Sequence, residues 1–113
     1  MYDTAMTAKG DISDKRLLRG FSYIGGKWQG ASSGETFAVT NPATGDVIGK
    51  VAALSELESL AAVDAAQAAF DGWAELLPQE RSGTLRRWFD LILTHKEDLA
   101  RIMVLEQGKP LSE

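Results

Sequence analysis

Few side chains in this sequence have the type and spacing that catalysis requires. The chain has no cysteine, which rules out a thiolate nucleophile and a thiolate metal site. Its single histidine, His95, cannot form a zinc site alone, and its charged neighbours favour a solvated side chain over a catalytic one. Ser82 and Ser112 have no organised base near them in the sequence, so a small serine hydrolase has little support. We therefore expect no catalytic residue in this chain.

The glycines are not spaced like a phosphate-binding loop, which must follow a strand and open a helix. The pair Gly25 and Gly26 lies between residues suited to strands and favours a tight hairpin instead. Gly45 and Gly49 fall in an expected turn and an expected strand. We expect no cofactor-binding residue, and no dinucleotide bound tightly by this chain.

One carboxylate lies where a helix disfavours it. The segment LEQGKP at 105–110 is typical of a helix end, because Gly108 suits a left-handed C-cap and Pro110 stops the helix. Glu106 falls in the last helical turn, next to the negative end of the helix macrodipole. A bound cation or a positively charged partner would offset this cost, and simple solvent exposure is the alternative interpretation.

The elements that must position these residues follow from the hydrophobic periodicity, which predicts two hairpins followed by three helices, an α+β arrangement. Ser55 with Glu58, and Thr94 with Glu97, match the capping-box pattern of helix starts. Pro78 suits the first position of a helix, where its missing N–H is harmless. Within 21–113 we expect strands in 23–53 and helices over about 55–73, 78–93 and 95–107.

The predicted helices carry apolar stripes that need partners. Two hairpins with strands of about six residues are not stable alone and require a further strand or helix over one face. Ordering each residue costs about 1–2 kcal/mol of backbone entropy, so a short chain must cover nearly all its apolar faces. The sequence leaves open whether this chain does so alone. The stripes include Phe70, Trp73, Trp88, Phe89 and Ile92.

Composition restricts the class of partner. The chain has 113 residues, enough for one domain, with 44% hydrophobic residues, 25% charged residues and a net charge of −4. That charge disfavours nucleic acid and anionic membranes as partners, and no apolar run is long enough to span a bilayer. Residues 1–20 are expected to form a mobile arm. This arm lacks the apolar core of a secretory signal, so a cytoplasmic location is expected.

Four segments resemble, in order, parts of the N-terminal segment of NAD(P)-dependent aldehyde dehydrogenases. YIGGKW at 23–28 resembles the opening hairpin of the family, and VTNPATGDVIGKV at 39–51 resembles the strand, turn and strand that follow. AAFDGWAELLPQERSGTLRRW at 68–88 resembles the link between the first two long helices, and LEQGKP resembles the helix-ending turn. The resemblance covers 23–113 and is closest to the succinate-semialdehyde dehydrogenase branch.

This resemblance implies an α/β parent enzyme, a dimer or tetramer, that oxidises succinate semialdehyde or a similar aldehyde to the acid with NAD or NADP. In the family a cysteine thiolate attacks the aldehyde, hydride passes to the nicotinamide, and a glutamate activates the water that releases the acid. These groups and the cofactor loops lie beyond the segment that this chain resembles. We therefore expect an inactive N-terminal fragment whose partner is the remainder of the polypeptide. The alternative is a self-contained α+β interaction module derived from that segment.

The resemblance also implies a metal site. Many family members hold a structural monovalent cation with backbone oxygens just before the Asn-Pro turn and with an acid in the helix-ending turn. On this sequence the matching positions are Val39, Thr40 and Glu106. Since Glu106 is also the carboxylate that the helix disfavours, we predict a monovalent cation beside it.

Overall fold

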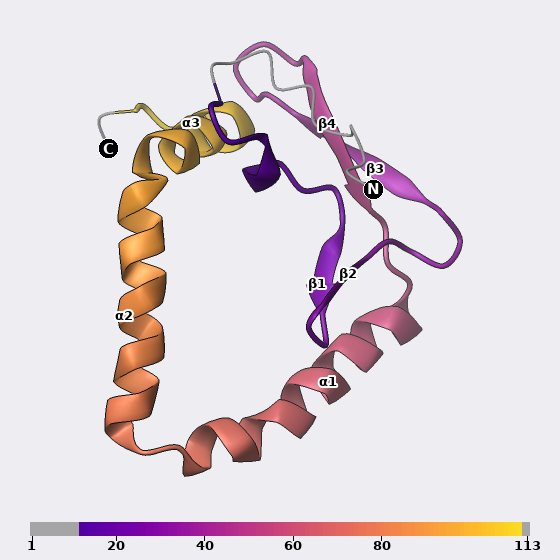
Figure 1. Ribbon diagram of the computed structural model, residues 1–113. Coiled ribbons are helices and arrows are strands. Elements are labelled where there is room, and N and C mark those ends of the chain that lie inside the picture. The colour runs from indigo at the N-terminus through magenta and orange to yellow at the C-terminus, as the bar shows by residue number, and fades with distance from the viewer. Residues whose placement is uncertain (1–11, 112–113) are drawn as a thin grey trace.

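The computed structural model describes residues 12–111, which form two β-hairpins followed by three α-helices (Figure 1). This order confirms the α+β arrangement expected from the sequence. The part of the expected mobile arm at 1–11 lies outside the described residues and stays a prediction. In chain order the elements are the 3-10 helix η1 (Lys15–Leu17), β1 (Ser22–Ile24), β2 (Lys27–Gln29), β3 (Thr36–Thr40), β4 (Val47–Ala52), α1 (Glu56–Glu75), α2 (Pro78–Thr94) and α3 (Lys96–Gln107).

The first hairpin, β1–β2, turns at the pair of glycines expected from the sequence. Gly25 and Gly26 have φ angles of 57° and 80°, in the left-handed region that glycine adopts without a steric cost. Tyr23 pairs with Trp28 across the strands, and their ring centroids are 5.1 Å apart. The guanidinium carbon of Arg19 lies 4.8 Å from the centroid of the Trp28 ring. These ring contacts hold the two short strands together.

The second hairpin, β3–β4, contains an irregularity beside a buried side chain. Val39 is opposite Gly49 and Thr40 is opposite Val47, so Ile48 is an extra residue on β4. Ile48 is only 5% exposed, and α3 lies against β3. Within the described part of the chain, the only other buried hydrophobic residue is Ile12, which is 3% exposed. The core of these residues is therefore very small.

Local capping sets where α1 and α2 begin. The Ser55 hydroxyl accepts the Glu58 N–H at 3.3 Å, and the Glu58 carboxylate accepts the Ser55 N–H at 2.7 Å, which confirms the first capping box. Pro78 takes the first position of α2, as predicted, and the Glu80 carboxylate accepts the Leu77 N–H at 2.9 Å. At the start of each of these two helices, a side chain of the first turn thus accepts a hydrogen bond from a backbone N–H that would otherwise lack a partner in the helix.

The second predicted capping box, Thr94 with Glu97, is wrong. Thr94 belongs to the last turn of α2, where its hydroxyl donates to the Asp90 carbonyl oxygen at 2.8 Å. α3 begins directly after His95, whose side chain makes no capping hydrogen bond. A capping box needs an extended residue in front of the helix, and the nearly continuous turn between α2 and α3 provides none.

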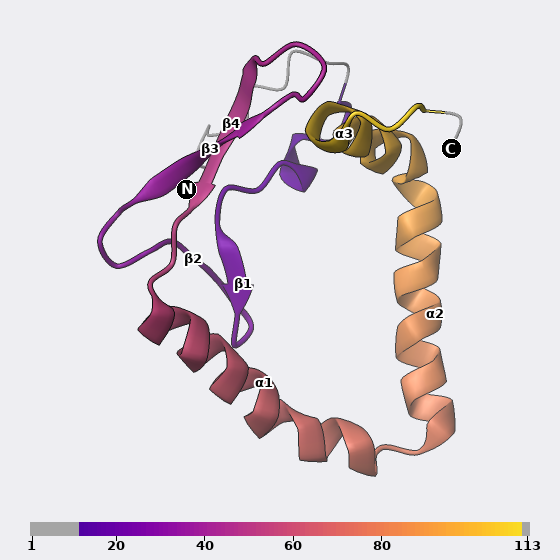
Figure 2. The same cartoon turned by 180° about the vertical axis from the view of Figure 1, so that it is seen from behind.

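The three α-helices follow one another around an open frame and do not form a bundle (Figure 1, Figure 2). The radius of gyration is 16.5 Å, whereas a compact chain of this length has about 13 Å. The accessible surface is 8652 Å², against about 6,100 Å² for a compact monomer of the same mass. The apolar stripes of the helices remain open to solvent, since Phe70, Trp73, Trp88, Phe89 and Ile92 are 39% to 62% exposed.

Candidate functional site

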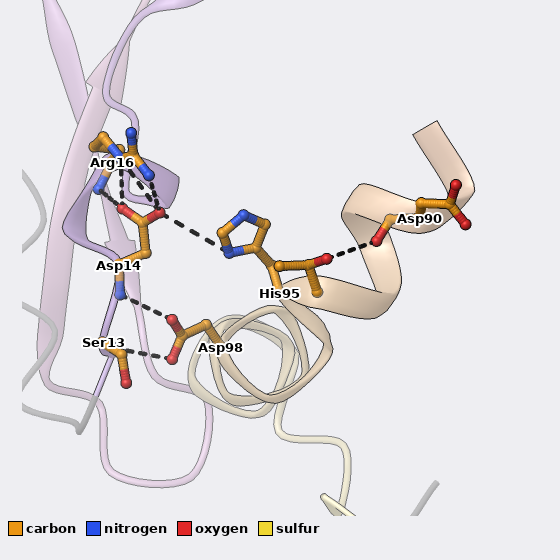
Figure 3. A network of polar contacts seen from close by, with 7 residues as sticks. Ser13, Asp14, Arg16, Asp90, His95 and Asp98 are labelled. Atoms are coloured by element: carbon orange, nitrogen blue, oxygen red, sulfur yellow. Dashed lines mark hydrogen bonds and ion pairs between the residues drawn. The ribbon is translucent and has the colours of Figure 1, made fainter. Parts of the chain in front are cut away.

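A polar network joins the N-terminal segment to the start of α3 (Figure 3). The Asp98 carboxylate accepts the Ser13 N–H at 2.9 Å and the Asp14 N–H at 2.8 Å. Asp98 is only 7% exposed, and these two donors, Ser13 first, lower the pKa of its carboxyl group. Because Ser13 and Asp14 follow the buried Ile12 directly, the two hydrogen bonds fix that part of the chain against α3.

Asp14 extends this network to Arg16 and His95. Its carboxylate accepts the Arg16 guanidinium at 2.8 Å and the Arg16 backbone N–H at 3.0 Å, and these bonds lower its pKa to about 2. The Nδ1 atom of His95 lies 3.9 Å from the same carboxylate, beyond hydrogen-bond distance, and the His95 side chain is 26% exposed. The histidine that the sequence suggested to be solvated is therefore half-buried beside an acid.

The network lacks the parts of a hydrolytic site. N–H donors hold the carboxylates of Asp14 and Asp98 in the charged form, so neither is tuned to take up a proton near neutral pH. Ser82 lies in the first half of α2 and His95 follows its end, so about 20 Å of helix separates them. A nucleophile and its base must be within hydrogen-bond reach, so these two side chains do not form a pair. Ser112 lies outside the described residues.

Replacing Asp98 with alanine is expected to release the N-terminal segment while α3 stays helical. The amides of Ser13 and Asp14 lose their charged acceptor, so their hydrogen exchange should become at least about tenfold faster. NMR measures the hydrogen-exchange rate of each of these two amides directly. Glu97→Ala is the matched control because Glu97 is exposed on the same helical turn. Unchanged exchange in Asp98→Ala would contradict the anchoring role.

The same contact is expected to weaken in acid. The pKa of Asp98 is lower in the folded chain than in the unfolded one, so its carboxylate contributes stability above the unfolded value of about 4. That contribution disappears as the pH falls through the lowered folded pKa, where the carboxylate takes up a proton. Protection of the Ser13 and Asp14 amides should therefore be constant from about pH 7 to pH 5 and decline in stronger acid.

The residues predicted to bind a cation lie at the ends of β3 and α3. Val39 is half-buried, Thr40 is the last residue of β3, and Glu106 is exposed in the last turn of α3. α3 lies against β3, and a Cβ atom at Gly108 would stand 3.0 Å from Pro42 Cγ. The structure therefore brings the helix-ending turn beside the Asn-Pro turn.

Two features of this region fit the donor set of a monovalent cation. The last turn of α3 contains no basic side chain, and Glu106 is exposed there, next to the negative end of the helix macrodipole. Gly108 has a φ of 78°, which lets the chain turn close to Pro42 without a side chain in the gap. Among residues 12–111, no group of three or more His, Cys, Asp or Glu side chains could hold a metal ion. A cation here would therefore rely on backbone oxygens in addition to one carboxylate.

Sequence reasoning missed that Asp98 and Glu58 hold segments from outside their own helices. Both acids occupy the third position of a helix, where a carboxylate ordinarily caps the turn to which it belongs. Glu58 also accepts the Ser32 N–H at 2.7 Å, and this bond contributes most to lowering its pKa to about 2. An acid at this position is visible in the sequence, but a partner from another element is not.

Comparison with known proteins gives matches over most of the chain. The family model described as "Aldehyde dehydrogenase family" matches residues 28–113. A glutarate-semialdehyde dehydrogenase of Pseudomonas putida is 48% identical over 102 residues, which cover 90% of this chain and 21% of that protein. An NADP(+) succinate-semialdehyde dehydrogenase of Escherichia coli is 47% identical over 102 residues, with the same coverage of 90% and 21%.

A solved structure matches equally well. The crystal structure of a succinate-semialdehyde dehydrogenase from Burkholderia pseudomallei has a TM-score of 0.86 and 49% identity to this chain. The match covers 92% of this chain and 22% of that one. The chain therefore spans about a fifth of the length of the relatives that it matches. Within residues 12–111, no helix combines the length and apolar character needed to cross a bilayer.

Proposed function

This chain belongs to the aldehyde dehydrogenase family, and we propose that it forms the N-terminal part of a semialdehyde dehydrogenase. The complete enzyme would oxidise succinate semialdehyde, or a similar aldehyde, to the acid with NAD or NADP. The relatives support this substrate class, because the matched proteins are named for glutarate semialdehyde and succinate semialdehyde.

The observation that carries this proposal is the set of large apolar side chains left open on α1 and α2. Phe70, Trp88 and Phe89 are 59%, 62% and 47% exposed. Burying each such side chain stabilises a fold by about 1.5–3 kcal/mol, so leaving all of them in water is unfavourable. This chain covers 21% to 22% of the matched relatives, which contain the further polypeptide that can cover these faces.

In this proposal the chain is a scaffold, and the reacting groups come from the other part of the enzyme. The 113 residues include no cysteine, so the thiolate of the family mechanism must be supplied from outside them. NAD or NADP would accept the hydride in that other part, and no residue of this chain is assigned to the cofactor. We further propose that the complete enzyme acts in the cytoplasm and, as the family resemblance implies, that it is a homo-oligomer.

The proposal is tested by joining this chain to the enzyme part that it would support. In the joined enzyme, residues 1–113 replace the matching segment of the Burkholderia pseudomallei protein, with which they share 49% identity. We expect turnover of succinate semialdehyde within about tenfold of the parent, because cores tolerate substitutions that preserve volume and pattern. The truncated relative, which lacks that segment, is the control and should be inactive. A folded joined enzyme without turnover would contradict the proposal.

A self-contained interaction module is the alternative function. Such a module would melt cooperatively as a monomer, because small single domains unfold in one transition. Ile12 and Ile48, the two buried hydrophobic residues of the described chain, provide little core for that behaviour. The small core therefore supports the role as part of a larger enzyme over the role as a module.

We also propose that Val39 and Thr40, through their backbone oxygens, and the Glu106 carboxylate hold a structural monovalent cation in the complete enzyme. The support is the position of Glu106 in the last turn of α3, which contains no basic residue, and the close approach of Gly108 to Pro42. A cation here would neutralise a carboxylate that the helix macrodipole disfavours. It would also connect the end of β3 to the end of α3.

Replacing Glu106 with glutamine in the joined enzyme is expected to abolish stabilisation by potassium or sodium. A bound ion stabilises the folded state by mass action, so the melting temperature should rise by about 2–5 °C when either ion replaces tetramethylammonium at equal ionic strength. Glu106→Gln should melt at the same temperature in all three salts. Glu97→Gln, at the opposite end of α3, should keep the full response. A full response in Glu106→Gln would count against the site.

A further inference from the structure

Residues 12–20, here called the N-terminal strap, run between the start of α3 and the first hairpin (Figure 1, Figure 2). Where the strap ends, the Gly20 carbonyl oxygen accepts the N–H of Ala52, the last residue of β4, at 2.8 Å. Where the strap begins, the Asp98 carboxylate of α3 accepts two of its backbone N–H groups. The strap therefore connects α3 to the second hairpin through hydrogen bonds at both of its ends.

The strap also reaches the joint between α2 and α3. His95 is the single residue between these two helices, and its Nδ1 atom lies 3.9 Å from the Asp14 carboxylate of the strap (Figure 3). The Arg16 guanidinium holds that carboxylate at 2.8 Å. The strap and the joint border an open hollow of about 400 Å³, so the angle between the two helices can change without a clash there. The residues that line this hollow are Ser13, Asp14, Thr94, His95, Glu97 and Asp98.

α3 is also attached at its other end. A Cβ atom at Gly108 would stand 3.0 Å from Pro42 Cγ, so the end of α3 lies at the turn between β3 and β4. The 12 residues of α3 make a rod of about 18 Å. A rod that is held at one end can pivot about that end, whereas attachments at both ends fix its direction. The contact of Asp98 with the strap is therefore the attachment that fixes where α3 starts.

The abutting helices explain why Asp98 is available to the strap. An acid at the third position of a helix ordinarily accepts the N–H of the residue in front of the helix, which here is His95. The His95 N–H instead donates to the Leu91 carbonyl oxygen at 3.1 Å, as part of the last turn of α2. The Asp98 carboxylate therefore binds the strap, at a residue 85 positions away, through charge-assisted hydrogen bonds that are stronger than neutral ones.

We propose that the N-terminal strap is a clasp that sets the angle at the α2–α3 joint, with Asp98 as its positioning residue. While Asp98 holds the amides of Ser13 and Asp14, the start of α3 stays beside the strap and α2 leaves the joint in one direction. When this contact is broken, the start of α3 moves away from β4 about its other end at Gly108, and α2 changes direction with it. This role depends on contacts within the chain and is independent of the proposed function.

A distance measurement between α3 and β4 tests the clasp. Because the chain has no cysteine, spin labels can be placed at two introduced ones, Lys50→Cys on β4 and Lys96→Cys at the start of α3. Both positions are exposed and neither belongs to the strap. Double electron–electron resonance on the full chain of 113 residues gives the distribution of distances between the labels. We expect one narrow distribution, and its width should increase at least about twofold in Asp98→Ala, because the start of α3 loses its attachment.

Two further variants show whether Asp98 acts through the strap. Deletion of residues 1–14 removes the amides that Asp98 binds and should broaden the distribution as much as Asp98→Ala does. The deletion combined with Asp98→Ala should cause no further broadening, because both changes remove the same contact. Glu97→Ala is the matched control, since Glu97 is exposed on the same helical turn, and it should leave the distribution narrow.

Three outcomes would overturn the clasp. In the first, the Ser13 and Asp14 amides exchange faster in Asp98→Ala while the distance distribution stays narrow, so the strap is attached to α3 without setting its direction. In the second, Glu97→Ala broadens the distribution as much as Asp98→Ala. In the third, the distribution is already as broad in the chain that keeps Asp98 and the strap. Circular dichroism checks the helix content of each variant, and if Asp98→Ala loses its helices, the deletion of residues 1–14 decides instead.

Discussion

In the joined enzyme, Trp88→Ala should lower the free energy of unfolding by about 3–5 kcal/mol, the cost of removing a large buried aromatic side chain. In the isolated chain the same substitution should change it by less than about 0.5 kcal/mol, as for other surface positions. The physical reason is that Trp88 is 62% exposed in this chain, whereas the proposed function requires the rest of the enzyme to cover α2 and bury it. The difference between the two changes in free energy of unfolding therefore shows whether the rest of the enzyme covers α2.

Urea titration measures this contrast in both proteins. Far-UV circular dichroism follows unfolding of the isolated chain, and loss of aldehyde oxidation follows it in the joined enzyme. Arg87→Ala is the control, since Arg87 is exposed on the polar side of α2 and its guanidinium donates to the Thr84 hydroxyl at 3.1 Å. It should be nearly neutral in both proteins. Equal effects of Trp88→Ala in the two proteins would show that the apolar side of α2, here called the α2 apolar face, is not covered in the complete enzyme. Its residues are Leu85, Trp88, Phe89, Ile92 and Leu93.

Joining should also slow hydrogen exchange in the middle of α2 by at least about 10³-fold. A 17-residue helix without packing partners is marginal in water, so its amides exchange through frequent local opening. Once the α2 apolar face is covered, the same amides exchange only through larger and rarer openings. Hydrogen exchange of a peptide over 85–93 is measured by mass spectrometry in the isolated chain and in the joined enzyme, which gives the ratio of the two exchange rates.

An internal control for this measurement is the segment at 12–18. Asp98 holds that segment through the Ser13 and Asp14 amides, which are contacts within the chain, so joining should change its exchange much less. Strong protection of 85–93 in the isolated chain already would be the behaviour of a self-contained module. That outcome would favour the alternative function over the proposed one.

Turns and helix ends that are set by neighbouring residues could be predicted from the sequence. The turn at Gly25 and Gly26, the start of α1 at Ser55 and the end of α3 at Gly108 each depend on residues next to the feature itself. The capping box predicted at Thr94 failed, because α2 runs almost directly into α3 and its last turn uses the hydroxyl. The sequence pattern indicates a capping residue but does not indicate that two helices abut.

Features that depend on the tertiary arrangement could not be predicted. The contact between Asp98 and the amides of Ser13 and Asp14 joins segments far apart in the chain, and nothing near Asp98 in the sequence indicates its partner. Periodicity placed Phe70 and Trp88 on apolar stripes, but it could not say that both would remain open to solvent. For the proposed cation site, family resemblance suggested the residues, and the structure adds that the two turns are neighbours.

The central claim is that this chain is a scaffold whose apolar faces are completed by the part of an enzyme that holds the nucleophile and the nucleotide. The most direct test is the rate of NAD(P) reduction with succinate semialdehyde, measured side by side for the isolated chain, the truncated relative and the joined enzyme. Only the joined enzyme should exceed the uncatalysed rate, by at least about 10⁶-fold. Turnover by the isolated chain would contradict the claim.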